Sequence, residues 1–390
     1  MNDARNRMRK GTGRLRRLGR LLPVLALLAT TAGAQAPSIT VRGYAKNLAL
    51  RSQSFFTKDP LFLDLTRLRL QGLADGPRWH GELWLDTEAL TGDFLTSPDY
   101  AFGQARERTT LTDLDWTLLE RRRLVVRQQL FRAFVTVYAG RAQLTLGRQR
   151  VAWGTGFVWN PTDLLNPVDP TAIEREEKAG VDAAYGALTL GALSRLEAVV
   201  APGRRHGQTS VAARLSGTIG EYDLALMGGR FRRRWVLGGD FAGYVGDGGL
   251  RGEAALTFPD AGRAYLRATL NADYNFAGGY YVFVELHHNG PGTRDRRRYD
   301  VGALLEGVLF NVAREYAAAS VAKSLTPLVA FNLYALQNLN DGSGLAGPAL
   351  VWSAAENLEV SASAYVFYGP GDTEFGALEN VYFAAVQFFF

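Results

Sequence analysis

The stretch "ENVYFAAVQFFF", residues 379–390, decides the fold. Every second residue back from the end of this stretch is apolar or aromatic, namely Phe390, Phe388, Val386, Ala384 and Tyr382. A period of two places these side chains on one face of a β-strand. An edge strand of a soluble sheet with such a face would pair with other chains and aggregate. The stretch therefore favours a strand whose outer face contacts lipid.

The same alternation recurs through most of the chain. In "RAYLRATLNADYNF", residues 263–276, polar side chains occupy one parity and mainly apolar side chains the other. The runs have roughly 10–13 residues, the length that crosses a bilayer as a tilted strand, whereas strands of soluble sheets average about 5–6. The expected strands are 39–50, 61–73, 78–89, 128–138, 142–151, 179–189, 192–202, 208–219, 221–231, 234–245, 248–258, 263–275, 279–289, 315–325, 327–339, 345–354, 358–368 and 380–390.

Connections of two lengths join these strands. Short turns occupy every second position, and the longer connections, 90–127, 152–178, 290–314 and 369–379, fall between them. This pattern predicts an all-β fold, a transmembrane antiparallel up-and-down β-barrel of about 18 strands in a bacterial outer membrane. A closed barrel pairs every backbone N–H and C=O group in lipid.

The first 34 residues have the composition of a secretory signal peptide. A basic stretch precedes the apolar run "LLPVLALLATTA" and a small-residue site that ends at Ala34. Cleavage there leaves residues 35–390 as the barrel, with 36 basic and 37 acidic residues. This balance excludes a basic protein that binds nucleic acid. The chain has no cysteine, and we expect neither a metal nor a cofactor.

The terminal strand also resembles the C-terminal signature of outer-membrane proteins. That resemblance implies recognition by the barrel-assembly machinery, with Phe390 and Phe388 facing lipid as the insertion signal. Two charge runs, "RERTTLTDLDWTLLERRR" (106–123) and "GTRDRRRYD" (292–300), fall in long connections. We expect them to be solvated or to contact lipopolysaccharide, with a smaller expectation of ligand capture.

Parity also identifies the side chains that face the barrel lumen. The candidate pore-lining residues are Arg42, Arg67, Arg69, Arg132, Arg214, Arg267, Glu82, Asp86, Asp273 and Glu285. Arginine binds carboxylate and phosphate groups through two donors, so a ladder of lumen arginines would favour anionic solutes. In the other interpretation these arginines pair with the wall carboxylates and hold the wall in shape.

Residues 132–167, "RAFVTVYAGRAQLTLGRQRVAWGTGFVWNPTDLLNP", resemble a motif of porin-like outer-membrane proteins. The shared features are Gly-Arg-Gln-Arg at a strand end, Trp-Gly, Asn-Pro-x-Asp and Asn-Pro. The same features are similar, more distantly, to the alginate export channel, and "NLNDGS" at 338–343 fits these barrels. The resemblance implies a passive channel in which one loop folds inward and narrows the pore.

That loop is expected at about 152–178. Prolines at 161, 167 and 170 restrict its backbone, and its tryptophans require a surface to bury against. Its candidate residues are Trp153, Trp159, Asn160, Asp163, Asn166, Asp169 and Glu174. The loop carboxylates either oppose wall arginines or cap turns. Arg148 and Arg150 share the lipid-facing parity, so they lie above the membrane unless a bulge at Gly147 turns them inward.

Sequence motifs of enzymes are absent. The chain contains no Gly-x-Ser-x-Gly elbow and no His-Glu-x-x-His zinc motif, and its four histidines are interpreted as structural. We therefore predict a channel rather than an enzyme, for small hydrophilic solutes or ions and with a preference for anions. The alternatives are an export channel for an anionic polysaccharide and a non-conducting structural or adhesive barrel. The oligomeric state does not follow from the sequence.

Overall fold

The computed structural model describes residues 36–105, 110–167, 169–174, 177, 180–205, 207–300, 302 and 311–390. The predicted signal peptide, 1–34, lies outside these residues, as does His206. No helix within the described ranges is long and apolar enough to cross a membrane.

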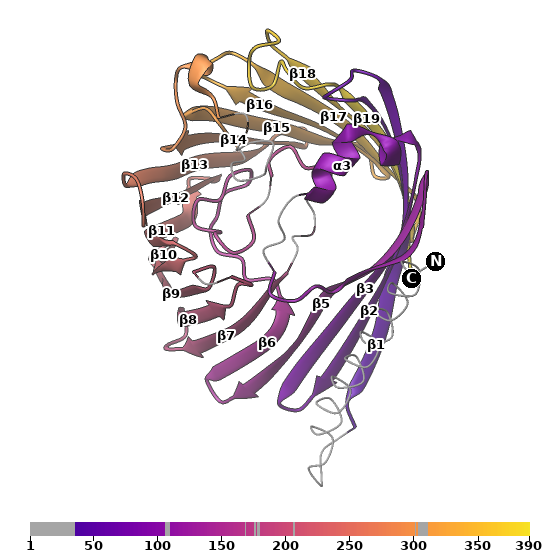
Figure 1. Cartoon of the computed structure of the whole chain (residues 1–390). Helices are drawn as coiled ribbons and strands as arrows, with labels where there is room; N and C mark the ends of the chain where they lie inside the picture. Colours follow the sequence, from indigo (N-terminus) through magenta and orange to yellow (C-terminus); the bar gives the residue numbers. More distant parts are fainter. Residues whose placement is uncertain are drawn as a thin grey trace.

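The structure is one antiparallel sheet that closes on itself, because β1 pairs with β19 (Figure 1). Eighteen of the nineteen strands form the wall of the barrel, as the alternation predicts. The strands are β1 (Ser38–Gln53), β2 (Pro60–Gly76), β3 (Trp79–Thr91), β4 (Asp115–Arg121), β5 (Leu124–Ala139), β6 (Ala142–Gln149), β7 (Val181–Thr189), β8 (Ser194–Ala201), β9 (Ser210–Ile219), β10 (Tyr222–Phe231), β11 (Arg234–Val245), β12 (Gly248–Pro259), β13 (Tyr265–Phe276), β14 (Tyr280–Asn289), β15 (Glu315–Thr326), β16 (Val329–Asn338), β17 (Gly344–Ala355), β18 (Leu358–Tyr368) and β19 (Val381–Phe389).

The extra strand, β4, corrects the expectation that 90–127 is a loop without a strand of its own. The segment also contains the helices η1 (Asp93–Thr96) and α3 (Pro98–Ala105), and β5 begins at Leu124 rather than near 128. β4 pairs with the first residues of β5. The shorter β6 does not extend along β5 as far as these residues, so β4 takes its place beside β5 there. Its register shifts between Thr117 and Leu119, which breaks the alternation that reveals the other strands.

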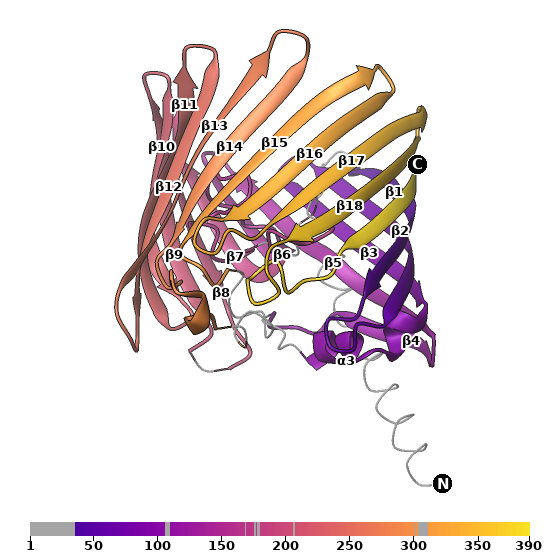
Figure 2. The ribbon, with the colours of Figure 1, turned by 90° about the horizontal axis from the view of Figure 1, so that it is seen from above.

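Figure 2 shows the tilted strands from the side, with tight turns at one end and the longer connections at the other. Both ends of the barrel sequence lie at the short-turn end, since Ser38 pairs with Asp75 beside the β2–β3 turn and Phe390 hydrogen-bonds to Gly43. In outer-membrane barrels the short turns are periplasmic and the longer loops are extracellular. The long-loop end is therefore the extracellular end.

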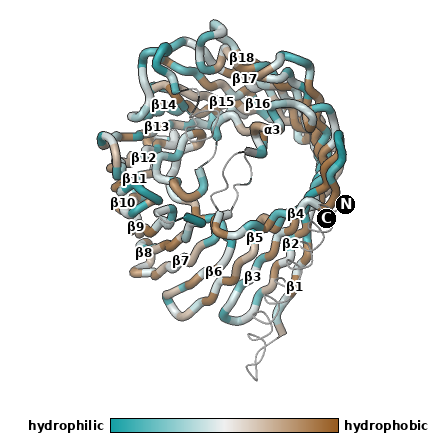
Figure 3. The backbone as a smooth tube through the Cα atoms, in the orientation of Figure 1, coloured by the Kyte–Doolittle hydropathy of each residue, from teal (hydrophilic) through white to brown (hydrophobic). Residues whose placement is uncertain are grey.

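The barrel is apolar on the outside and polar on the inside. Outward side chains of central strands are mostly apolar and highly exposed, including Leu226 at 71% and Leu237 at 61%. Inward side chains are often charged yet buried, including Arg69 at 2% and Glu285 at 1%. Figure 3 shows apolar positions recurring along the strands all round the wall. This distribution of side chains, the reverse of that in a soluble protein, is typical of a barrel whose outer face contacts lipid.

The terminal strand closes the barrel. The amide and carbonyl groups of Phe390 both hydrogen-bond to Gly43, at 3.0 and 2.8 Å. Phe388 and Phe390 share the outward parity with Val386, and their rings stack with centroids 6.4 Å apart. These positions agree with the lipid-facing role expected for the two phenylalanines. Whether they act as an insertion signal stays a prediction.

Val386→Arg tests the outward face of this strand. Val386 lies on the lipid-facing parity, so we expect the arginine to destabilise the barrel by about 2 kcal/mol. The matched control is Gln387→Arg, whose side chain lies on the inward face next to Glu359 and Lys46. Urea unfolding in phospholipid vesicles measures both. Equal destabilisation by the two substitutions would contradict the assignment of faces.

Candidate functional site

The connection between β6 and β7 folds into the barrel and contacts its far wall. The backbone N–H groups of Phe157, Val158 and Trp159 donate to the carboxylate of Glu285 on β14, at 2.7, 3.1 and 2.8 Å. Three converging N–H donors satisfy a buried carboxylate without a cationic side chain. Glu285, predicted as a lumen residue, therefore holds the loop.

A second wall carboxylate, Glu253 on β12, holds the same loop. It accepts hydrogen bonds from the N–H groups of Gly156 and Thr162, at 2.9 and 3.1 Å, and from the Thr162 hydroxyl at 2.5 Å. Glu253 was not among the predicted lumen residues. The available signal was its parity, which it shares with Arg251 on the inward face of β12.

Aromatic packing buries the loop against the wall. The ring of Trp159 stacks on His287 with centroids 5.0 Å apart, and its indole nitrogen donates to Asn311 at 2.9 Å. Trp159 belongs to an apolar cluster that includes Tyr316 and Leu336. Trp153 is buried in another cluster and packs edge-on against Phe231. The two tryptophans thus have the burial that the sequence analysis required of them.

Polar side chains fix the turns inside the loop. Asn160 donates to the carbonyl of Gly156, and Asn166 accepts from the N–H of Val151. Asp163 accepts from the N–H of Asn166 at 3.2 Å, and Asp169 accepts from the N–H and hydroxyl of Thr171. For these two aspartates the structure shows the turn-capping arrangement.

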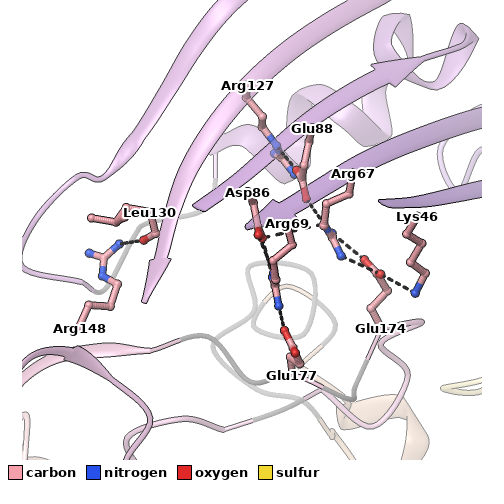
Figure 4. Close-up of polar contacts among 10 residues, drawn as sticks. All are labelled: Lys46, Arg67, Arg69, Asp86, Glu88, Arg127, Leu130, Arg148, Glu174 and Glu177. Carbon is pink, nitrogen blue, oxygen red and sulfur yellow. Dashed lines mark hydrogen bonds and ion pairs between the residues drawn. The ribbon is translucent and has the colours of Figure 1, made fainter. Parts of the chain in front are cut away.

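The later part of the loop contacts cations on the opposite wall (Figure 4). Glu174 accepts from Arg67 on β2 through two bonds, at 2.9 and 2.8 Å, and from Lys46 on β1 at 3.0 Å. Glu177 forms an ion pair with Arg69, which also binds Asp86 on β3 at 2.6 and 2.5 Å. At this end, loop carboxylates do oppose wall arginines.

The two sets of anchors lie on different parts of the wall. Strands β15 to β19 separate β14 from β1 in the closed sheet, so the loop crosses the lumen between them. On the way, the carbonyl of Ala172 accepts from the hydroxyl of Tyr365 on β18 at 3.2 Å. A segment held at both sides of a barrel narrows the space between its walls.

The ionic anchor depends on pH through Glu174. Burial would raise the pKa of Glu174, but the hydrogen bonds from Arg67 and the charges of Arg67 and Lys46 outweigh burial and lower it. A lowered pKa means that this ion pair stabilises the loop at neutral pH and loses that contribution as the pH falls below the ordinary carboxyl range.

Most other predicted pore-lining residues lie in local pairs. Arg214 binds Glu197 and Asp240, and Arg67 also binds Glu88 at 2.6 Å. The remaining contacts are Asp273 with Arg251, Glu82 with His80, Arg42 with Gln71, Arg267 with Asn289, and Arg132 over the ring of Trp84. Glu88 was missed in the sequence, although it shares the parity of Asp86. Among the contacts of the described residues, Arg67, Arg69 and Arg214 thus have carboxylate partners, while Arg42 and Arg267 bond to neutral amides.

Arg148 and Arg150 take different directions. β6 keeps a continuous register with β5 and β7 through Gly147, so no bulge turns Arg148 inward. Arg148 stays on the outward parity at the strand end, where it binds Asp182 at 2.9 Å and the carbonyl of Thr112 at 2.8 Å. The strand ends at Gln149, and Arg150 beyond it lines an interior cavity.

This cavity, of about 370 Å³, lies beside the start of the loop. Arg132 and Arg150 contribute positive charge to it, and Phe134, Trp153 and Tyr185 contribute aromatic surface. Two carboxylates also line the cavity: Glu82 contacts His80, and Glu197 contacts Tyr185 and Arg214. The cavity has the size and polarity for a small solute.

Another buried carboxylate, Glu374, joins segments at the long-loop end. Glu374 accepts from the N–H of Val312, the hydroxyl of Tyr316 and the amide of Asn338, at 3.1, 2.7 and 2.7 Å. Burial, together with the charge of the neighbouring Asp341, raises the pKa of Glu374 to about 7, although hydrogen bonds from the three donors oppose the rise. Glu374 is therefore protonated when it is buried at mildly acidic pH.

Glu374→Gln is expected to remove a pH dependence from this connection. The raised pKa means that the seated connection loses stability as the pH rises from about 4.5 to about 7, by up to roughly 1.4 kcal/mol per pH unit. A neutral amide does not titrate, so the stability of the connection in the variant should not change with pH over this range. Hydrogen exchange of 370–378, corrected for the chemical exchange rate, measures the change. Asp372→Asn, an exposed carboxylate nearby, is the control; the same pH response in the wild type and Glu374→Gln would contradict the assignment.

No group of three or more metal-binding side chains occurs in the part of the chain that the structure describes. No family model and no curated protein matches the sequence.

Solved structures of bacterial outer-membrane channels share the fold. A BenF-like porin from Pseudomonas fluorescens Pf-5 aligns with TM-score 0.57 and 7% identity, over 90% of this chain and 98% of that one. Pseudomonas aeruginosa OpdK with vanillate aligns with TM-score 0.57 and 9% identity, over 90% and 98%. Pseudomonas aeruginosa OccK2 (OpdF) in complex with glucuronate aligns with TM-score 0.54 and 9% identity, over 91% and 99%. These structural neighbours are channels rather than enzymes, and at such identities the likeness concerns the fold. The chain is a β-barrel of the bacterial outer membrane.

Proposed function

We propose that this barrel is a porin-type channel through which small hydrophilic solutes diffuse, with a preference for anions. The observation that carries the proposal is the loop held across the lumen beside a solute-sized cavity with two arginines. A narrowed, polar passage through a lipid-facing barrel is the arrangement that a diffusion channel requires.

The charge distribution supports the preference for anions. The wall carboxylates Glu253 and Glu285 are occupied by N–H donors of the loop, and Asp86 and Glu174 by arginine or lysine. The ion pairs compensate the charge of Asp86 and Glu174, whereas Glu253 and Glu285 are buried beneath the loop, away from passing solutes. Arg132 and Arg150 both line the cavity and place two positive charges on its wall.

The neighbours' ligands agree with this preference. OpdK was solved with vanillate and OccK2 with glucuronate, and both ligands carry a carboxylate. The alternative of exporting an anionic polysaccharide is less well supported, because a polymer would have to displace a loop that is held on both walls. A non-conducting barrel is the other alternative, and conductance distinguishes it.

Planar-bilayer recording of the purified protein tests the function. We expect discrete conductance steps and a reversal potential in a salt gradient that indicates anion preference. A protein that inserts but passes no current would contradict a channel. Swelling of proteoliposomes in gluconate compared with glucose then measures whether a carboxylate speeds entry.

Arg132→Gln plus Arg150→Gln should lower the anion preference. The two substitutions remove both positive charges from the cavity, so the ratio of anion to cation permeability should fall by roughly twofold or more, with a small change in conductance. Arg141→Gln, in an exposed turn at the short-turn end, is the control. An unchanged reversal potential in the double variant would rule out the cavity as the selective region.

A further inference from the structure

Exposed arginines are concentrated on one arc of the long-loop end. In and beside the long-loop-end connections between β8 and β15 the described residues include ten exposed arginines against three exposed aspartates, Asp260, Asp295 and Asp300. The arginines are Arg204, Arg205, Arg232, Arg233, Arg234, Arg263, Arg294, Arg296, Arg297 and Arg298. Glu315 and Asp372 pair with two of these arginines, Arg294 and Arg296. At the short-turn end of the same strands the exposed charged residues described are acidic: Glu221, Asp223 and Asp247. The two edges of this side of the barrel therefore carry opposite charge.

The tightest turn on this arc is made of arginine. The hairpin between β10 and β11 turns at Arg232 and Arg233, and Arg232 has a φ of 56°. Glycine or asparagine is favoured at such a position, because a side chain there costs about 1 kcal/mol or more. The comparable turns at the short-turn end place glycine at positive φ, as at Gly140, Gly220 and Gly246. Here the sequence keeps a charged side chain despite its conformational cost.

The same hairpin joins this charge to the lipid-facing surface. Trp235 is exposed on the outward parity and pairs with Phe258 of β12. Arg230 lies on the same outward face, with its guanidinium 5.9 Å from the Trp235 ring and an ion pair to Asp260 at 2.9 Å. Aromatic rings of this kind form the girdle at the membrane interface. The arginines thus begin where the apolar belt ends.

We propose that the arginine arc, defined as these ten arginines with Arg230, binds the phosphate groups of an anionic glycolipid in the outer leaflet. Phosphate groups lie at the interface, directly beyond the acyl chains. Guanidinium groups bind them through paired hydrogen bonds, and each basic residue near an anionic surface strengthens binding. The bisphosphorylated lipid A part of lipopolysaccharide has this chemistry.

The test uses the full-length purified barrel and lipid A in mixed micelles, with binding measured by native mass spectrometry. In the tip variant, Arg232→Gln, Arg233→Gln and Arg234→Gln, we expect the Kd for diphosphoryl lipid A to rise at least about tenfold. The control, Arg78→Gln plus Arg141→Gln, removes exposed positive charge from two turns at the short-turn end, away from the outer leaflet. Its Kd should change less than about twofold.

Two further measurements keep the proposal falsifiable if the tip variant folds poorly. Arg232→Gly relieves the positive φ, so it should fold at least as well as the wild type and still bind lipid A more weakly. Monophosphoryl lipid A should bind the wild type more weakly than the diphosphoryl form. The proposal is overturned by equal losses in the tip and control variants, by full displacement with inorganic phosphate, or by a tip variant that keeps its lipid affinity but loses anion conductance. The last result would assign the arginines to steering solutes.

Discussion

The double variant Arg67→Ala plus Arg69→Ala is expected to conduct more current than the wild type and to shift its selectivity towards cations. The two arginines bind Asp86, Glu88, Glu174 and the neighbouring Glu177. Removing one partner of a buried ion pair costs about 3–5 kcal/mol, because the other charge stays buried without compensation. The carboxylates would repel one another, and the last part of the loop would leave the wall.

Single-channel conductance and reversal potential in a salt gradient measure the two effects separately. Arg42→Ala is the matched control, since Arg42 also faces the lumen but bonds to the neutral Gln71 and not to the loop. We expect that control to change selectivity slightly and conductance little. A double variant with wild-type conductance would show that this anchor does not hold the loop, and an unchanged reversal potential would remove the arginines from selectivity.

Glu285→Ala should release the opposite end of the loop. The substitution leaves the N–H groups of Phe157, Val158 and Trp159 without their acceptor, at a cost of roughly 1–3 kcal/mol for each of the two buried groups, those of Val158 and Trp159. The apolar contacts of Trp159 remain, so we expect a loop that opens and closes rather than an unfolded barrel. Current traces should show added fluctuations, and hydrogen exchange of 156–160 should become faster.

Glu285→Gln keeps the shape of the side chain but weakens it as a hydrogen-bond acceptor, so it separates these two contributions. The amide keeps one oxygen acceptor and replaces the other with a donor, so its effect should lie between those of the wild type and Glu285→Ala. Glu82→Ala removes a different lumen carboxylate that contacts His80 rather than the loop, and exchange of the loop should then stay unchanged. Exchange rates for 156–160 that match the wild type in Glu285→Ala would contradict the anchor.

The barrel was predictable from the sequence because each side chain of a strand points either into the lumen or towards the lipid. A buried polar and an exposed apolar face repeat along each strand, so Arg69 and Leu226 are assigned to inside and outside without knowledge of their partners. The assignment fails where the strand itself ends or slips. Arg150 left its expected face because β6 ends at Gln149, and β4 was missed because its register shifts.

The loop contacts were less accessible from the sequence. Proline and tryptophan indicate a rigid, buried loop, yet the acceptors of its N–H groups, Glu253 and Glu285, lie about 100 residues away or more along the chain. Backbone donors leave no mark in a sequence, since every residue except proline has one. The charge pattern offered two roles for the loop carboxylates, opposing wall arginines or capping turns, and did not indicate which carboxylate takes which role.

The two loop anchors differ in chemistry, and this difference affects how the width of the passage responds to salt. At Glu285 the loop is held by N–H donors in a buried setting, whereas Glu174 and Lys46 are ionic partners and Glu174 is partly open to solvent. Dissolved electrolyte screens exposed charges far more than buried hydrogen bonds. Added salt should therefore weaken the Glu174 side of the loop more than the Glu285 side, although partial burial of Arg67 and Lys46 limits the screening. We therefore expect high salt to widen the passage on one side only.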